Sequence, residues 1–274
     1  GPGTMSLAFC EKILEYQPES KIIVNLIDVS SLMLEQAKKI YHEFFPQVQL
    51  NIFSPQEFIK RAHKTQSKES SLKLLMFSNS FNEIGEEKTI DYFKNVDFDF
   101  LLFLGVGTRD SFKNLLKLKD SIEGASNYSI VYPCKASGLE CPMSKDDWCH
   151  QTIRVKNDSD FNQVSQMAKI DRRSLAFTFH LYKNDLRKSS KLVPRGPLIP
   201  AVIIQFLGKN KAAYRWRICF LEQRVKELKI LEAECLLRGL SKKEQKKLES
   251  IQVGDNISFS IQKKLDDYRI RISL

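Results

Sequence analysis

The sequence predicts an α/β protein in which a doubly wound, Rossmann-like sheet is followed by a cysteine-rich segment and a small β-rich domain. Short apolar strands alternate with helical stretches over the first 133 residues, as in sheets built from parallel strands and crossover helices. Three cysteines then fall within sixteen residues, and a strand-rich basic stretch closes the chain. We therefore expect three parts, at residues 1–133, 134–195 and 196–274.

Alternating signals define the first part. KIIVNLID (21–28) is rich in β-branched residues and predicts a strand, and SSLMLEQAKKIYHEFF (30–45) has apolar residues at helical spacing. Four more apolar runs predict strands: VQLNIFS (48–54), LKLLMFSNS (72–80), FDFLLFLGVG (98–107) and NYSIVYPC (127–134). The short connections between these elements favour parallel strands with right-handed crossovers. From Cys134 to about Asn184 the pattern breaks down, so order there should depend on something other than a hydrophobic core.

The last part reads as three strands, a helix and two strands. The strands are expected at 201–208, 213–221, 225–237, 256–262 and 268–274, with the helix at 241–251. This is the element order of an OB-like barrel, a fold that often holds nucleic acid. A β-extension packed on the first domain is equally compatible with the order.

Charge is distributed unevenly along the chain. The formal net charge is +10, yet residues 1–182 carry 22 Lys and Arg against 23 Asp and Glu, whereas residues 183–274 carry 21 against 10. A basic segment of this kind faces a polyanion such as RNA or is simply a solvated surface. Within it, Tyr214 and Trp216 alternate with Arg215 and Arg217. They would stack on bases and contact phosphates, or they are the alternating core and surface positions of a strand.

A glycine-containing turn opens the chain. In nucleotide-binding sheets such a turn lets the backbone approach the ligand, and an acidic residue about 20 positions later binds the ribose. Here Asp28 ends a predicted strand 25 residues after Gly3. Gly1, Gly3 and Asp28 are therefore candidate cofactor residues, and the first strand of the sheet is expected before residue 1. A leader left by a cloning vector is the alternative interpretation of the first four residues.

Polar residues follow the strand that ends near Phe77. In a doubly wound sheet the carboxyl ends of the strands form the ligand-binding edge. Ser78 and Asn82 are therefore candidates for the cofactor pocket, with Glu83 beside them. A polar loop that caps the next helix explains the same residues. No catalytic residue can be assigned from the sequence.

Cysteines give the strongest chemical signal. Cys134, Cys141 and Cys149 lie in a polar stretch, separated by six and seven residues. In a reducing compartment such a cluster favours metal or iron–sulfur ligation over disulfides, although the gaps match neither a zinc ribbon nor a ferredoxin. Disulfides and incidental thiols remain the alternatives. The first candidate for a fourth ligand is Cys219, and Cys235, His150 and His180 follow; Cys10 is expected in the core.

Several stretches together carry a family resemblance: the Gly-Pro-Gly-Thr turn, LIDVSSLML, SNSFNE, LGVGT and IVYPCKASGLECPMSKDDWCHQTIR. They are similar to the small ribosomal subunit assembly family of methyltransferase-like proteins found in bacteria and mitochondria, the family of methyltransferase-like protein seventeen. The likeness runs from residue 1 to about 185 and is thinner after residue 195.

The resemblance implies a class I methyltransferase fold with an S-adenosylmethionine pocket and a cysteine-held 4Fe–4S cluster, with zinc as the alternative metal. It matches Gly1, Gly3 and Asp28 to cofactor positions, and the three clustered cysteines to ligands. Where the family has its fourth cysteine this chain has Leu207, so Cys219 on the neighbouring strand is the expected substitute. At LGVGT the family's acidic residue and proline are replaced by Gly105 and Val106.

The resemblance also implies partners and a compartment. We expect small-subunit rRNA and ribosomal proteins as partners, no membrane, and a monomer away from the ribosome. The compartment would be the cytoplasm in a bacterium and the mitochondrial matrix in a eukaryote. No run of eighteen apolar residues and no secretory signal is present in the sequence.

Whether the protein is an enzyme stays open. SNSFNEIG (78–85) lacks the proline and aromatic residue with which base methyltransferases grip an amino group. An assembly factor on a methyltransferase-like scaffold is therefore favoured over an active rRNA methyltransferase. A zinc-stabilised RNA-binding protein without a cofactor is the third hypothesis.

Overall fold

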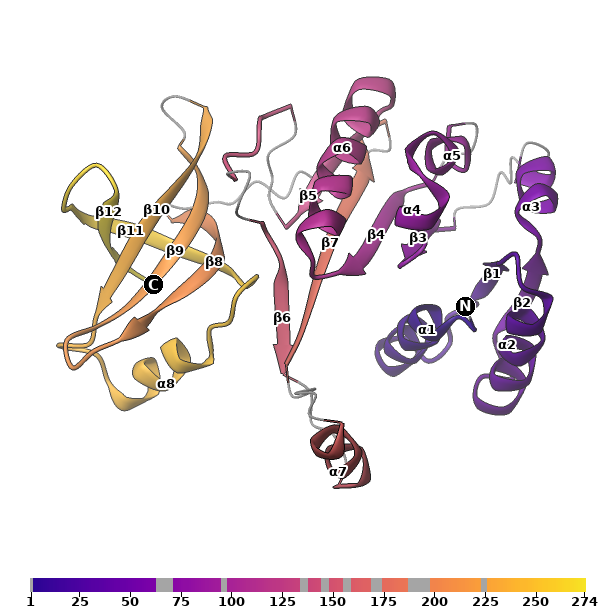
Figure 1. Cartoon of the computed structure of the whole chain (residues 1–274), viewed down its shortest axis with the longest axis horizontal. Helices are drawn as coiled ribbons and strands as arrows, with labels where there is room; N and C mark the ends of the chain where they lie inside the picture. The colour runs from indigo at the N-terminus through magenta and orange to yellow at the C-terminus, as the bar shows by residue number, and fades with distance from the viewer. Residues whose placement is uncertain are drawn as a thin grey trace. The chain divides into compact units, whose positions relative to one another are not determined.

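The computed structural model divides the chain into two units (Figure 1). Unit 1 comprises Gly1–Ser71 and Asp91–Asp97, and unit 2 comprises Leu72–Ile90 and Phe98–Leu274. The structure describes residues 2–62, 71–94, 98–133, 138–143, 148–154, 159–168, 174–186, 198–222 and 226–274. The domain boundary that the sequence predicts at residue 195 lies outside these ranges.

Unit 1 contains a parallel pair of strands and three helices. Its elements are α1 (Thr4–Tyr16), β1 (Ile23–Ile27), α2 (Ser31–Phe44), β2 (Gln49–Phe53) and α3 (Pro55–Ala62). Strand β1 pairs with β2 in parallel, with Val24 opposite Leu50. Helix α2 begins where the Ser30 side chain accepts a hydrogen bond from the Met33 amide, which satisfies one unpaired donor of the first turn. The buried side chains of α1, β1 and α2 form one core: Cys10, Val24, Leu26, Leu34, Ala37, Tyr41 and Val48. Cys10 is a core residue, as predicted.

Unit 2 begins with a five-stranded sheet. Its elements are β3 (Leu74–Ser78), α4 (Phe81–Ile84), α5 (Glu86–Asp91), β4 (Phe100–Val106), α6 (Arg109–Ala125), β5 (Tyr128–Tyr132), β6 (Gln151–Arg154), α7 (Ser159–Met167) and β7 (Ser174–Asn184). The order is β3-β4-β7-β5, and β6 pairs with β7. Strands β3 and β4 are parallel, as expected, but β7 is antiparallel to its three partners β4, β5 and β6.

The prediction of irregular order after Cys134 is wrong for β7. This strand has eleven residues and lies between β4 and β5 in the sheet. Tyr182 is fully buried there and meets Phe103 edge to face at 5.8 Å. The sequence hides this strand because its inward-facing residues include His180 and Thr178, which are polar yet buried.

Helix α6 covers this sheet and supplies part of the site described below. Thr108 caps its first turn by accepting a hydrogen bond from the Ser111 amide at 3.3 Å. Its buried apolar residues recur every three or four positions and form the stripe that faces the sheet: Phe112, Leu115, Leu118 and Ile122. Lys119 falls on the same face, which is an unusual position for a charged residue.

The C-terminal part of unit 2 is a closed five-stranded barrel. Its elements are β8 (Ile199–Lys209), β9 (Ala213–Glu222), β10 (Glu227–Leu236), α8 (Lys242–Ser250), β11 (Asn256–Lys264) and β12 (Arg269–Ser273), and the strands close in the order β10-β12-β11-β8-β9. Each predicted element is present. Tyr214 and Trp216, 4% and 1% exposed, stack at 5.6 Å in the barrel core. The hypothesis that they stack on bases is therefore wrong, because alternation along β9 turns them inward.

Hydrogen bonds join the barrel to the sheet within unit 2. The Thr152 amide of β6 donates to the Val253 carbonyl at 3.0 Å, and the Tyr132 hydroxyl of β5 donates to the Gly254 carbonyl at 3.3 Å. Gly254 has a φ of +92°, and a Cβ added to it would lie 2.3 Å from Gln151 Cγ. Only glycine therefore fits this junction.

Candidate functional site

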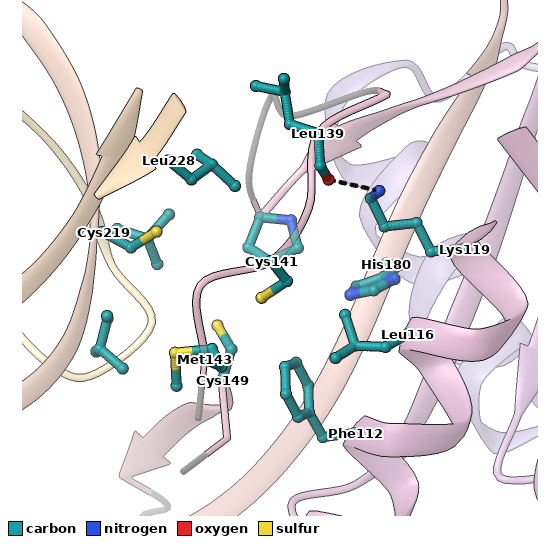
Figure 2. Close-up of a pocket in the computed structure, with 13 residues that line it drawn as sticks. Phe112, Leu116, Lys119, Leu139, Cys141, Met143, Cys149, His180, Cys219 and Leu228 are labelled. Carbon is teal, nitrogen blue, oxygen red and sulfur yellow. Dashed lines mark hydrogen bonds between the residues drawn. The ribbon is translucent and has the colours of Figure 1, made fainter. Parts of the chain in front are cut away.

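Three of the four predicted cysteine ligands line one cavity of unit 2. Cys141 and Cys149 come from the cysteine-rich segment, and Cys219 comes from β9 of the barrel (Figure 2). Helix α6, strands β7, β8 and β10, the residue after β5 and the cysteine-rich segment itself supply the rest of the lining: Phe112, Leu116, Lys119, Pro133, Leu139, Met143, His180, Val202, Ile204 and Leu228. Residues that are far apart in the sequence thus place three thiols around one space.

The fourth predicted ligand, Cys134, lies outside the described residues, as does Gly1 among the cofactor candidates. Pro133, the residue before Cys134, lines the cavity. On the barrel side, Cys219 pairs in register with Val202 of β8. Leu207, where the resembled family has its cysteine, is also on β8 but is not part of the cavity lining. Cys219 is thus the cysteine that the barrel contributes to this space.

The donor chemistry of the cavity suits a thiophilic metal, but the described atoms do not form a finished coordination site. Within the described ranges, no group of three or more His, Cys, Asp or Glu side chains is arranged to hold a metal ion. The cavity volume is about 30 Å³, which is room for two or three water molecules at roughly 10–15 Å³ each. A four-iron cluster would therefore require the two cysteine-bearing segments to shift. Burial raises the pKa of the Cys141 thiol, so a thiolate there calls for a compensating positive charge.

A buried ion pair holds the segment that carries Cys141. Lys119 Nζ lies 2.8 Å from Glu123 Oε2, and the two side chains are 6% and 10% exposed. Lys119 also donates to the Leu139 carbonyl at 3.1 Å (Figure 2). Glu123 Oε2 accepts from the Gly138 amide at 3.1 Å. Lys119 and Glu123 therefore both form hydrogen bonds to the backbone just before Cys141. Sequence reasoning missed this pair; its signal is an i, i+4 Lys and Glu on the apolar face of a predicted helix.

His180 is the other titratable group at the cavity. It is 4% exposed, and its Nδ1 lies 3.0 Å from the Tyr182 hydroxyl. Burial and the nearby Lys119 ammonium lower the pKa of His180 to about 3, so the ring is neutral near pH 7. Of the residues considered as a fourth ligand, His180 and Cys219 line the cavity, whereas Cys235 is buried in the barrel core.

Trp148, the residue before Cys149, is held by two ring contacts. The Arg109 guanidinium, in the first turn of α6, lies 4.9 Å from the centre of the Trp148 ring. His150, the residue after Cys149, stacks on Trp148 with the ring centres 5.2 Å apart. A cation over an indole is a favourable contact. His150, another ligand candidate, is thus engaged with Trp148. The sequence singled out the Trp-Cys-His run but not Arg109.

Gly3 and Asp28, the cofactor candidates of unit 1, lie at the ends of α1 and β1. Gly3 precedes α1 with a φ of +81°, and its carbonyl accepts hydrogen bonds from Ser6 Oγ at 2.8 Å and the Leu7 amide at 2.9 Å. An added Cβ would lie 3.0 Å from the Leu26 side chain, so the turn requires glycine. Asp28 directly follows β1, and its carboxylate accepts from the Ser30 amide at 2.7 Å.

The cofactor candidates of unit 2, Ser78 and Asn82, lie at the end of β3 and in α4. Ser78 is exposed. Asn82 donates to Ser111 Oγ at 3.2 Å and accepts from the Asn114 side chain at 3.0 Å. Its side chain thus ties α4 to α6, which is a structural role. The glycines of LGVGT are equally structural: a Cβ on Gly107 would lie 2.5 Å from the backbone of Ala176 in β7.

Comparison with known families decides what kind of protein carries this site. The model of the family described as mitochondrial small ribosomal subunit Rsm22 matches residues 3–232. The chain belongs to the Rsm22 family. This confirms the resemblance derived from the sequence, and it links the chain to the small ribosomal subunit and to methyltransferase-like proteins.

In this Rsm22-family chain the match runs from residue 3 of unit 1 through the sheet and the first two strands of the barrel, and it ends within β10. It includes the three cavity cysteines, Cys141, Cys149 and Cys219. No individual curated protein matches the chain. Among the described helices, none is long and apolar enough to cross a membrane.

Proposed function

We propose that this Rsm22-family protein is an assembly factor of the small ribosomal subunit that carries a thiolate-ligated 4Fe–4S cluster on a methyltransferase-like scaffold. The convergence of Cys141, Cys149 and Cys219 on one cavity carries the proposal. Thiols from separate segments that meet in an apolar space are the donors that iron–sulfur clusters take. Cys134, next to the cavity-lining Pro133, is proposed as the fourth ligand. The cluster would join the cysteine-rich segment to the barrel.

The scaffold part of the proposal assigns unit 1 and the sheet of unit 2 to a class I methyltransferase-like fold. The parallel pairs β1–β2 and β3–β4 support it, since the first pair is connected through α2 and the second through α4 and α5. We propose that Gly3 and Asp28 belong to an S-adenosylmethionine pocket, in which the turn would approach the cofactor and the carboxylate would bind ribose hydroxyls. Within unit 2, taken by itself, Ser78 is a better candidate for a polar contact to a ligand than Asn82, because the Asn82 side chain is occupied by α6.

The barrel is proposed to be of the OB type. Five strands close on themselves and the only helix described between them follows the third strand, which is the arrangement that the element order predicts. OB-type barrels often bind nucleic acid, and the basic charge of this part of the chain supports rRNA as the ligand. The compartment would be the mitochondrial matrix in a eukaryote and the cytoplasm in a bacterium.

Methyl transfer is the second candidate function. It requires chiefly that a nucleophile be positioned against an activated methyl group. Asn82, the side chain after β3 best placed to orient an amine, is instead bonded to Ser111 and Asn114. This observation favours a scaffold over an active base methyltransferase.

Anaerobic purification tests the proposal. The expected protein is brown, with a visible charge-transfer band and iron and acid-labile sulfide in equal amounts. A colourless protein with stoichiometric zinc would replace the cluster by a zinc site. Binding of labelled S-adenosylmethionine without methyl transfer to small-subunit RNA supports the scaffold, whereas transfer of the label to RNA would establish an enzyme.

A further inference from the structure

Helix α8 lies at one end of the barrel (Figure 1). It carries four exposed lysines. We call them the α8 basic face: Lys242, Lys243, Lys246 and Lys247. The helix is fixed from its opposite side, because Leu248 is buried in the barrel core and the Gln245 side chain donates to the Leu240 carbonyl at 3.0 Å. The lysines are therefore displayed by a firmly seated element.

The helix dipole opposes two of these lysines and favours only Lys247, which lies in the last turn. Lys242 and Lys243 occupy the first turn, where the positive end of the helix dipole disfavours cations. Lys242 with Lys246, and Lys243 with Lys247, are like charges four residues apart, which repel each other on a helix surface. Local stability therefore does not explain why this short helix carries four lysines.

The carboxylates of α8 are engaged elsewhere. Glu244 accepts from the Ser241 amide and hydroxyl in a capping box. Glu249 accepts from Lys209 Nζ and from the Tyr214 hydroxyl, both at 2.9 Å. In the part of the chain that the structure describes, no carboxylate lies within ion-pair distance of the α8 basic face, although Lys246 acts on Glu249 at longer range. Most of its charge is therefore available to a partner.

Two further exposed cations extend this surface. Lys211 lies in the β8–β9 turn and Arg238 lies between β10 and α8. The Leu237 amide donates to the Ala212 carbonyl at 2.8 Å, which brings the two turns together. The basic surface therefore continues from α8 onto the tip of a hairpin.

We propose that the α8 basic face binds the phosphate backbone of RNA. Lysines are point charges on flexible stems, which suits contacts to phosphates that fix orientation without reading sequence. The inference rests on the proposed association with rRNA. It does not come from the family match, because α8 lies beyond residue 232, where the match ends.

The test replaces all four lysines by glutamine, which removes the charge and keeps a good helix former. The matched control replaces four lysines that have carboxylate partners, Lys12, Lys38, Lys229 and Lys264. Both variants lose the same charge. Affinity for a labelled polyuridine strand and for a labelled duplex RNA is measured by fluorescence anisotropy over a range of salt concentrations, and circular dichroism checks folding.

The α8 variant should bind RNA at least about tenfold more weakly, with a salt slope less steep by about 3, while the control stays within about twofold of the parent. Equal losses in both variants, or no loss in the α8 variant, would overturn the inference while leaving the proposed function standing. Absence of RNA binding by the parent would contradict both the inference and the proposed function. If the α8 variant binds RNA normally but no longer binds small-subunit particles, the partner is an acidic protein surface and the inference of RNA binding is overturned.

Discussion

Lys119 and Glu123 form a buried ion pair, 2.8 Å from nitrogen to oxygen, whose two members both hold the backbone just before Cys141. Replacing Lys119 by Met should lower the free energy of unfolding by about 3–5 kcal/mol, because the buried ion pair with Glu123 and the hydrogen bond to the Leu139 carbonyl are both lost. Amide exchange at Gly138 should also accelerate. Urea unfolding and hydrogen–deuterium exchange measure the two effects.

Removing the second charge provides the control for this prediction. The double variant Lys119→Met/Glu123→Gln should recover much of the lost stability, since the buried negative charge is then removed together with the positive one. If the single variant unfolds like the parent, the pair does not hold the cysteine segment.

Trp216 should behave as a core residue. Trp216→Ala should cost about 3–5 kcal/mol in the free energy of unfolding, because a fully buried aromatic ring leaves a cavity. Trp216→Phe should cost less and should leave RNA affinity unchanged once the protein is folded. Lost RNA binding by Trp216→Phe at parental stability would mean that the ring faces the nucleic acid.

Gly254 should not tolerate a side chain. Gly254→Ala combines a φ of +92° with a contact of 2.3 Å to Gln151 Cγ, so we expect a loss of about 1–3 kcal/mol or more. Thermal melting measures it. Gly239→Ala is the comparison, since Gly239 also has a positive φ but an added Cβ meets nothing within 4 Å. Equal losses would show that backbone strain alone, without the clash at the junction, sets the cost.

Tyr41 links pH to the glycine turn of unit 1. Its hydroxyl donates to Ser6 Oγ at 2.8 Å, and Ser6 donates to the Gly3 carbonyl. Burial raises the pKa of Tyr41 to about 12 from an ordinary value of 10.0. Its contribution is fully present below pH 10 and is lost as the pH rises from about 10 to about 12, because the unfolded state releases the proton first. Tyr41→Phe should flatten this part of the stability curve, measured by urea unfolding; an unchanged curve would contradict the assignment.

Strand and helix positions were readable from the sequence wherever apolar periodicity was clean. The strands around Val24, Met76 and Phe103 and every element of the barrel were predicted in this way. β7 was missed because buried His180 and Thr178 break the apolar pattern, and its antiparallel direction depends on pairing with β4 and β5, which no local signal reports.

The sequence predicted the cysteines of the candidate site, but it did not predict the contacts that hold them in place. Cys141, Cys149 and Cys219 were named from spacing and resemblance, and the fold brings these three to one cavity. The roles of Lys119 and Glu123 were not predictable, because their importance comes from burial and from backbone groups 15 to 20 residues away. Asn82 was proposed for the cofactor pocket, yet only the packing of α4 on α6 reveals its bonds to Ser111 and Asn114.

Metal content of cysteine variants tests the central claim most directly. Iron and acid-labile sulfide are measured per chain after anaerobic purification of the parent, Cys219→Ser and Cys235→Ser. Cys219 lines the cavity, whereas Cys235 is buried in the barrel core. We predict about four iron and four sulfide atoms in the parent and in Cys235→Ser, and a marked loss of both in Cys219→Ser. Equal iron and sulfide in all three proteins, or none in the parent, would contradict the account.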